Sequence, residues 1–292
     1  MNKFLTVSIF AALAISATTP ASALTITPLE SNEDTGTDLA TAWLGASSGI
    51  TVVGPVSYVG ANNQAGTYTG FDLTSSSPTS PNVTFGDGIL LTSGNADIPN
   101  SNTLSNFGAI TSTGPSTTIS TITGLGTNDT NSISFSFTVG SGITSISSNF
   151  IFGSEEFPEY AGTEFADGFA FVIDGINYAK FSDGTNVSLA TLSSNANLLD
   201  NTAGIYGIEY DGFTLALGIV GILNSGLTEH TLEIVIADTG DSVLDSGVFL
   251  SALSGGKDTG GGGVTTTPVP AALPLMATAL GLFGFSKRRK NA

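Results

Sequence analysis

The sequence predicts an all-β protein: an antiparallel β-sandwich of the jelly-roll kind with one short helix near its N-terminus. The chain of 292 residues contains 37 glycines, and its short apolar runs are separated by Gly, Asn, Asp and Pro turn signals. Several runs alternate between apolar and polar residues, as half-buried strands do. In the run 132–139, one strand face would carry Ile133, Phe135, Phe137 and Val139.

The expected elements follow one another along the chain. A helix is predicted over 35–46, with Thr37 or Asp38 as its N-terminal cap. Its apolar face would consist of Leu39, Ala42, Trp43 and Ala46. Strands are predicted over 50–54, 88–94, 132–139, 148–153, 168–175, 213–223, 230–238 and 247–253. This pattern indicates an antiparallel sandwich.

Composition and charge narrow the range of partners. The hydrophobic fraction of 40% is enough for a sizeable core, and the 24 acidic against 7 basic residues give a net charge of -17. Between Leu24 and Gly256 the only base is Lys180. Such a surface repels phosphate backbones and attracts cations, so nucleic-acid binding is excluded. The chain has no cysteine, so core burial or bound metal must stabilise it.

Residues 1–23 have the pattern of a cleavable signal peptide for export. Lys3 precedes an apolar run over 4–15 that is too short to span a bilayer. Ala21 and Ala23 then form the small-x-small cleavage pattern. We expect cleavage after Ala23; the alternative is an uncleaved hydrophobic anchor.

The other end of the chain has the pattern of a sorting signal. The expected domain, 24–253, is followed by a Gly/Thr-rich linker over 254–267 and a tail over 268–292. The tail combines a Pro-Val-Pro-Ala motif with an apolar stretch over 271–285 that predicts a membrane helix. The basic residues that follow it are expected to stay on the cytoplasmic side.

In these features the tail resembles the VPLPA type of PEP-CTERM sorting signal of Gram-negative bacteria. The matching residues are Pro268, Pro270 and Ala271. The resemblance implies export across the inner membrane, transient anchoring there by the C-terminal helix, and processing by an exosortase-type enzyme. The alternative is a permanent single-span anchor.

Acidic residues gather in two blocks that could bind a cation. The stretch 150–175 contains six carboxylates, and DTGDSVLD adds three more. Ca²⁺ takes six to eight oxygen ligands, often from several loops, and the spacing does not fit an EF-hand. The predicted metal ligands are Glu155, Glu156, Asp167, Asp238, Asp241 and Asp245. The alternative is that most of these side chains cap turns or face water.

Catalysis is the opposing hypothesis, in the form of a secreted carbohydrate-active hydrolase with paired carboxylates. If a strand continues through Glu155 and Glu156, these neighbours point to opposite faces and cannot act as one acid/base pair. His230 is the only histidine, so a His-based zinc site is excluded and a structural or exposed role is favoured over a catalytic one. We therefore predict no catalytic residues and no enzymatic activity.

Four segments in order resemble the choice-of-anchor L domain. These are the stretch from Asp38 to Tyr68, GILLTSGNA, the block Gly153-Ser154-Glu155-Glu156-Phe157, and the block from His230 to Leu253 with its Ile-Ala-Asp motif. Ala166 departs from the family pattern, which commonly has Asn there. The resemblance implies attachment to cells. We expect a cell-surface or extracellular-matrix protein that functions in adhesion by binding polysaccharide or another matrix component.

Overall fold

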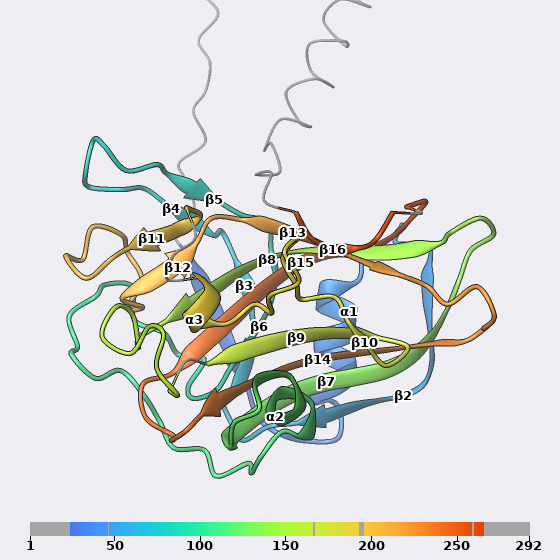
Figure 1. Cartoon of the computed structure of the whole chain (residues 1–292), viewed down its shortest axis with the longest axis horizontal. Coiled ribbons are helices and arrows are strands. Elements are labelled where there is room, and N and C mark those ends of the chain that lie inside the picture. The colour runs from blue at the N-terminus through green and yellow to red at the C-terminus, as the bar shows by residue number, and fades with distance from the viewer. Residues whose placement is uncertain (1–23, 46, 166, 193–195, 259, 266–292) are drawn as a thin grey trace, which may run out of the picture.

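The strands of the protein form two large antiparallel sheets that pack face to face, which confirms the predicted all-β sandwich (Figure 1). The computed structural model describes residues 24–265 except 46, 166, 193–195 and 259. The predicted signal peptide and sorting tail therefore lie outside the described residues. Within the described part, no helix has the length and hydrophobicity needed to cross a membrane.

The larger sheet has nine strands. In order across the sheet they are β1 (Thr25–Leu29), β3 (Ala65–Thr69), β6 (Gly88–Thr92), β15 (Ser246–Gly256), β8 (Ser145–Ser154), β12 (Gly212–Thr214) and β11 (Leu198–Asp200), while β13 (Leu217–Ile222) also pairs with β8 and carries β16 (Gly263–Thr265) on its other side. The expected strand 213–223 is thus divided between β12 and β13.

The smaller sheet has five strands, and a separate ribbon has two. In order, the five are β10 (Ile176–Asn177), β9 (Gly168–Ile173), β14 (His230–Thr239), β7 (Thr127–Val139) and β2 (Ile50–Val59); the ribbon pairs β4 (Asp72–Leu73) with β5 (Val83–Thr84). Alternating side chains of the two large sheets meet in the core, where the rings of Phe150 and Phe169 lie 5.1 Å apart. Each buried phenylalanine contributes about 2–3 kcal/mol.

Helix α1 (Thr35–Trp43) confirms the predicted helix, which begins at the expected residue and ends three residues earlier than expected. Its N-cap is Asp34, so the expectation of Thr37 or Asp38 in that position was wrong. With this start, the i, i+3, i+4, i+7 face that packs on the sheets consists of Gly36, Leu39, Ala40 and Trp43. The expected Ala42 is exposed.

Two short helices, α2 (Thr117–Thr123) and α3 (Leu189–Leu192), were not predicted. The β-branched sequence of α2 has low helix propensity. Tertiary contacts and capping compensate: the Ser116 side chain accepts a hydrogen bond from the Ile119 N–H, and Ile119 packs with Ala170 and Val235 on the outer face of the smaller sheet. Figure 1 shows α2 in front of this sheet.

Parts of the expected 254–267 linker are strands in the structure. β15 extends to Gly256, and β16 pairs with β13. Val264 of β16 is only 8% exposed because it packs into the main core. Burial of the Val264 side chain, together with the pairing of β16 with β13, holds this Gly/Thr-rich segment at the edge of the sheet.

Candidate functional site

Five of the six predicted metal ligands lie buried at one end of the sandwich, where β8 and β14 end and β9 and β15 begin. The acidic cluster consists of Glu155, Glu156, Asp167, Asp238 and Asp245, none of them more than 2% exposed. Asp241 is not part of it: this residue is partly exposed, and its side chain accepts a hydrogen bond from the Val243 N–H. The cluster is formed by strand ends, which bring acids distant in sequence together.

The acidic side chains alone do not form a set of metal ligands. Among the residues that the structure describes, no three Asp, Glu or His side chains are placed so that they could hold one ion between them. A cation at this end of the sandwich therefore needs further oxygens from hydroxyl groups, main-chain carbonyls or water, all of which Ca²⁺ accepts.

One function of the cluster is to hold down a long irregular segment. The clamped loop, 93–116, connects β6 to α2 without regular secondary structure. The Asp245 carboxylate accepts hydrogen bonds from the main-chain N–H groups of Asn95 (3.2 Å) and Ala109 (3.0 Å). Gly94 is required beside it, because a Cβ atom there would lie 1.5 Å from the carboxylate.

Other acids clamp the same loop, and three of them, Glu209, Asp129 and Asp211, were not predicted as site residues. Glu155 Oε1 accepts from the Phe107 N–H (3.2 Å), while the fully buried Glu209 accepts from Thr103 (3.1 Å) and Leu104 (2.6 Å). Two further contacts join Asp129 to the Ser112 N–H (2.7 Å) and Asp211 to the side-chain amide of Asn102 (2.6 Å). The loop is thus anchored through charge-assisted hydrogen bonds.

A second group of acids in the cluster lacks such partners. Neither carboxylate oxygen of Asp238 has a hydrogen bond to any described residue. Asp167 uses Oδ1 to accept from the Thr239 N–H (2.9 Å), but its Oδ2 has no partner in the described part of the chain. Asp238 lies beside Asp167 and Ser93 without a hydrogen bond of good geometry to either. Buried acceptors without partners are rare in native proteins.

Burial and mutual repulsion make these carboxyl groups weak acids. Desolvation raises the pKa of Glu155 to about 8 and that of Glu156 to about 9, against the lowering effect of main-chain hydrogen bonds to each carboxylate. Desolvation also raises the pKa of Asp245 to about 7. For Asp167 and Asp238, burial and the charge of a neighbouring acid hold the pKa well above its usual range.

The geometry offers little to a hydrolase. β8 ends at Ser154, so Glu155 and Glu156 are not strand neighbours on opposite faces; instead they contact different segments, the Phe107 N–H and the Asp167 N–H. Both are 2% exposed. Acid/base catalysis on a polysaccharide requires carboxyl groups that reach the glycosidic bond, and these two face the interior.

His230 has a structural environment. It is 4% exposed, and its Nδ1 lies 2.8 Å from Asp174 Oδ2. Asp174 also accepts hydrogen bonds from the main-chain N–H groups of Thr231 and Asn224. The pair therefore ties the β9–β10 turn to the start of β14, far along the strands from the acidic cluster.

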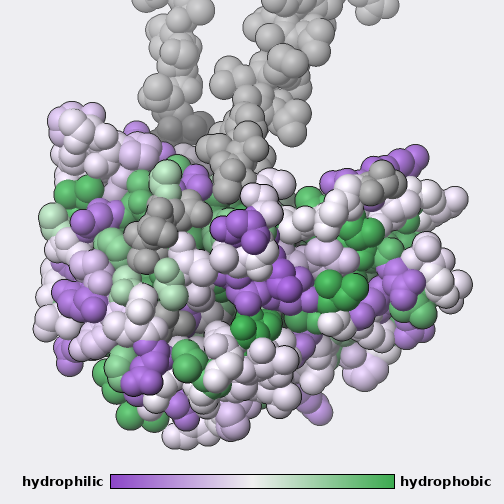
Figure 2. All heavy atoms as spheres, in the orientation of Figure 1, coloured by the Kyte–Doolittle hydropathy of each residue, from purple (hydrophilic) through white to green (hydrophobic). Residues whose placement is uncertain are grey.

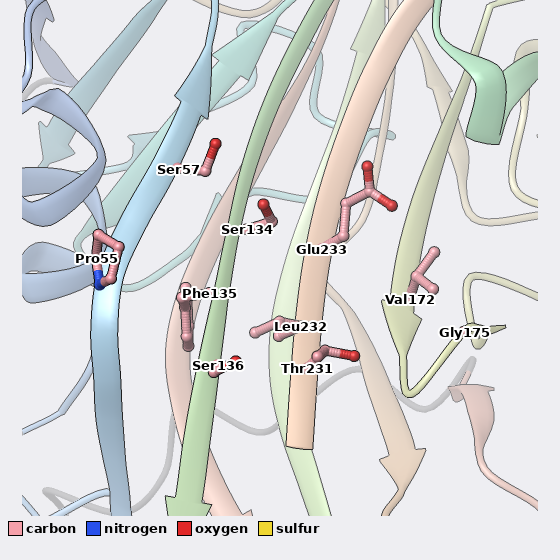
Figure 3. Close-up of a pocket in the computed structure, with 10 residues that line it drawn as sticks. All are labelled: Pro55, Ser57, Ser134, Phe135, Ser136, Val172, Gly175, Thr231, Leu232 and Glu233. Carbon is pink, nitrogen blue, oxygen red and sulfur yellow. The ribbon is translucent and has the colours of Figure 1, made fainter. Parts of the chain in front are cut away.

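The open face of the smaller sheet carries a shallow trough of about 440 Å³ lined by both polar and apolar side chains. Ser57, Ser134 and Glu233 follow one another across β2, β7 and β14 (Figure 3). The next row pairs Ser136 with Thr231. Figure 2 shows hydrophobic residues as separate spots among polar ones on the face in view, without one broad apolar patch.

Three of the six tyrosines are too deeply buried to stack on a sugar. Tyr68, Tyr206 and Tyr210 are at most 2% exposed, whereas Tyr160 is 40% exposed. The trough is lined by no Tyr or Trp, and its polar contacts are the hydroxyl groups of Ser and Thr and the Glu233 carboxylate.

Comparison with known proteins identifies the family. No curated protein and no solved structure matches the chain. The family model of the Choice-of-anchor L domain matches residues 28–255, a range that includes the smaller sheet, most of the larger sheet and the acidic cluster. This family is not an enzyme family, and its domain indicates a surface-associated, extracellular protein. Because the match covers more than half of its length, the chain belongs to the Choice-of-anchor L domain family.

Proposed function

We propose that the protein is an exported binding protein of the cell surface or extracellular matrix that functions in adhesion and is stabilised by Ca²⁺. The observation that carries the proposal is the contrast between buried acids and an open trough: the carboxyl groups suited to catalysis are inaccessible, while hydroxyl groups face solvent. Surfaces of this kind bind ligands without transforming them.

The proposed ligand is an extracellular polysaccharide of low charge. Ser57, Ser134 and Glu233 offer hydroxyl and carboxylate groups to sugar hydroxyls, and the trough has no basic residue in its lining. A net charge of -17 disfavours polyanions. One oxygen of Glu233 accepts a hydrogen bond from the Thr118 hydroxyl (3.1 Å), which orients the carboxylate.

The proposed route to the surface starts with export and cleavage after Ala23. An exosortase-type enzyme then processes the tail at the motif that contains Pro268, Pro270 and Ala271, after transient anchoring in the inner membrane of a Gram-negative host. Support comes from the sequence pattern and from a family of surface-associated proteins. In a host strain without the exosortase, the protein is expected to keep its C-terminal tail and so to have a larger mass than the protein from the unmodified strain. Equal masses in the two strains would contradict this route.

Co-sedimentation with the host's extracellular polysaccharide tests the binding proposal. We expect the purified protein to pellet with the polymer, more completely in Ca²⁺ than in EDTA, and the polymer to keep its chain length. Shortening of the polymer would overturn the binding function in favour of the hydrolase, and absence of protein from the pellet in both conditions would reject the polysaccharide as its ligand.

A further inference from the structure

Unpartnered oxygen atoms gather around one buried side chain, Tyr210. Within the described part of the chain, six such atoms lie in this region: Glu155 Oε2, Asp167 Oδ2, Asp238 Oδ1 and Oδ2, the Tyr210 hydroxyl and Ser246 Oγ. We refer to them as the buried oxygen site. The charges of Asp245, Glu155, Asp238 and Asp167 all act on the Tyr210 hydroxyl, and Ser246 lies beside Asp167.

The backbone leaves room for Tyr210 at this position. Gly153 and Gly247 are paired across β8 and β15. A Cβ atom at Gly247 would lie 2.3 Å from the Tyr210 hydroxyl, and one at Gly153 would lie 2.4 Å from its ring. Two glycines side by side therefore admit an aromatic side chain whose polar end reaches the acidic cluster.

The negative charge of this site has no basic counterpart. Lys180 and Lys257 are the only bases between Leu24 and Thr265, and the only ion pair among the described residues joins His230 to Asp174. A carboxylate buried without a partner costs several kcal/mol. Either protons or a cation must neutralise the group.

A cation accounts for more of the unpartnered atoms than a shared proton does. A proton shared between Asp167 and Asp238 neutralises one charge of the pair, but it leaves the Tyr210 hydroxyl and Glu155 Oε2 without a partner. A hard divalent cation takes six to eight oxygen ligands and accepts hydroxyl oxygens along with carboxylates. The ligand chemistry therefore matches Ca²⁺.

We propose that Asp167 and Asp238, with Ser246 and the Tyr210 hydroxyl beside them, form a buried Ca²⁺ site, and that Asp245 and Glu209 serve instead to clamp the 93–116 loop. This inference rests on the Ca²⁺ stabilisation in the proposed function and assigns it to named oxygens. It narrows the six ligands expected from the sequence to Asp167 and Asp238, which keep carboxylate oxygens without a partner. The other four accept main-chain hydrogen bonds: Glu155 and Asp245 from the clamped loop, Glu156 from Asp167, and Asp241 from Val243.

Thermal melts of the full chain in EDTA, Mg²⁺ and Ca²⁺ test the site. We expect Ca²⁺ at about 100 times its Kd to raise the Tm of the wild type by roughly 5–10 °C. Asp238→Asn should lose this gain and melt in EDTA at or above the wild type, because it removes a buried charge that has no partner. The matched control, Asp97→Asn at an exposed position, should keep the full gain.

Two further measurements keep the inference testable if Asp238→Asn does not fold. Ser246→Ala removes a neutral oxygen and should shift the Ca²⁺ midpoint to higher concentration. Tb³⁺ in place of Ca²⁺ should give luminescence sensitised by Tyr210, which lies beside the ion, and excess Ca²⁺ should quench it.

The outcomes separate this inference from the proposed function. A wild type whose Tm is equal in EDTA and Ca²⁺ overturns the site, as does an Asp238→Asn variant that keeps the Ca²⁺ gain. Binding to polysaccharide is measured on the same wild-type sample, so an adhesion protein without a Ca²⁺ site at these oxygens is distinguished from a protein that does not bind the polymer.

Discussion

Two groups of buried acids at the same end of the sandwich have the same chemistry and different partners. Asp245 and Glu209 are fully buried, and each accepts hydrogen bonds from two N–H groups of the clamped loop. Asp238 is 1% exposed and accepts none from the described residues. Burial is therefore the same in both groups, and hydrogen bonding differs.

This difference determines what each acid does for the protein. A buried carboxylate that accepts N–H groups replaces the water it lost, and its removal leaves those donors unpaired. A buried carboxylate without partners keeps the cost of its desolvation until a proton or cation neutralises it. The first kind stabilises the fold, whereas the second creates a place for a ligand.

The largest expected effect comes from breaking a clamp. Glu209→Leu keeps an apolar side chain of similar length but leaves the Thr103 and Leu104 N–H groups without an acceptor. Loss of two charge-assisted hydrogen bonds should lower the free energy of unfolding by about 3 kcal/mol in Ca²⁺ and in EDTA alike, measured by urea unfolding. Glu209→Gln keeps one acceptor oxygen and should lose less; an undiminished stability of Glu209→Leu would contradict the clamp.

The next effect is a dependence on pH in the metal-free protein. The pKa values of Glu155 and Glu156 are raised to about 8 and about 9 in the folded state, so the folded protein holds protons that the unfolded chain releases above pH ~4.5. Stability should therefore be greatest at acid pH and fall as pH rises through 5 to 9, by about 1.4 kcal/mol per pH unit for each proton held. Melts in EDTA across this range measure the slope.

Ca²⁺ should flatten that slope, because a bound cation stabilises the ionised carboxylates and competes with the protons. A stability in EDTA that rises between pH 5 and 9 would show that the cluster is ionised and already compensated in the metal-free fold. An equal slope with and without Ca²⁺ would separate the acidic cluster from cation binding.

A smaller effect is expected at the His230–Asp174 pair. Asp174→Asn keeps a residue that tolerates the positive φ of 50° found here. The substitution removes the negative charge that contacts His230 and two main-chain N–H groups. We therefore expect the free energy of unfolding to fall by about 1 kcal/mol. Because the pair lies away from the buried oxygen site, the loss should be equal in Ca²⁺ and EDTA; a change in the Ca²⁺ gain would link the two regions.

The smallest effect on stability is expected in the trough. Glu233→Gln alters a half-exposed side chain and should change the free energy of unfolding by less than about 0.5 kcal/mol. If the trough binds polysaccharide, this variant and Ser134→Val should both pellet less with the polymer, while Asp97→Asn should pellet normally. Unchanged co-sedimentation of both trough variants would show that the polysaccharide binds at another surface of the protein.

The sequence predicted the long central strands because their signals are local, whereas seven shorter ones were not predicted: β1, β3, β4, β5, β10, β11 and β16. Alternation and turn residues placed β7, β9, β14 and β15 correctly, and the one expected helix is present. The Thr-rich α2 was missed because contacts with Ala170 and Val235 outweigh its propensity. In α1 the packing against the sheets buries Ala40 in place of the expected Ala42.

The candidate site was only partly predictable. Acids in two conspicuous blocks pointed to Glu155, Asp167 and Asp238, and the fold buries all three. The sequence could not distinguish these three acids from Asp245. The hydrogen-bond donors to Asp245 come from the clamped loop, residues 93–116, which is distant from Asp245 in the chain. Tyr210 and Glu209 lie in an ordinary strand-like segment, and only the tertiary fold brings them to the cluster.

The most direct test of the account is the Ca²⁺ content of the protein, measured by elemental analysis after exhaustive dialysis against a low Ca²⁺ concentration. The account predicts a bound Ca²⁺ in the wild type that is retained in Asp97→Asn and Glu209→Gln and lost in the Asp167→Asn/Asp238→Asn double variant. Equal Ca²⁺ content in the wild type and the double variant would contradict it.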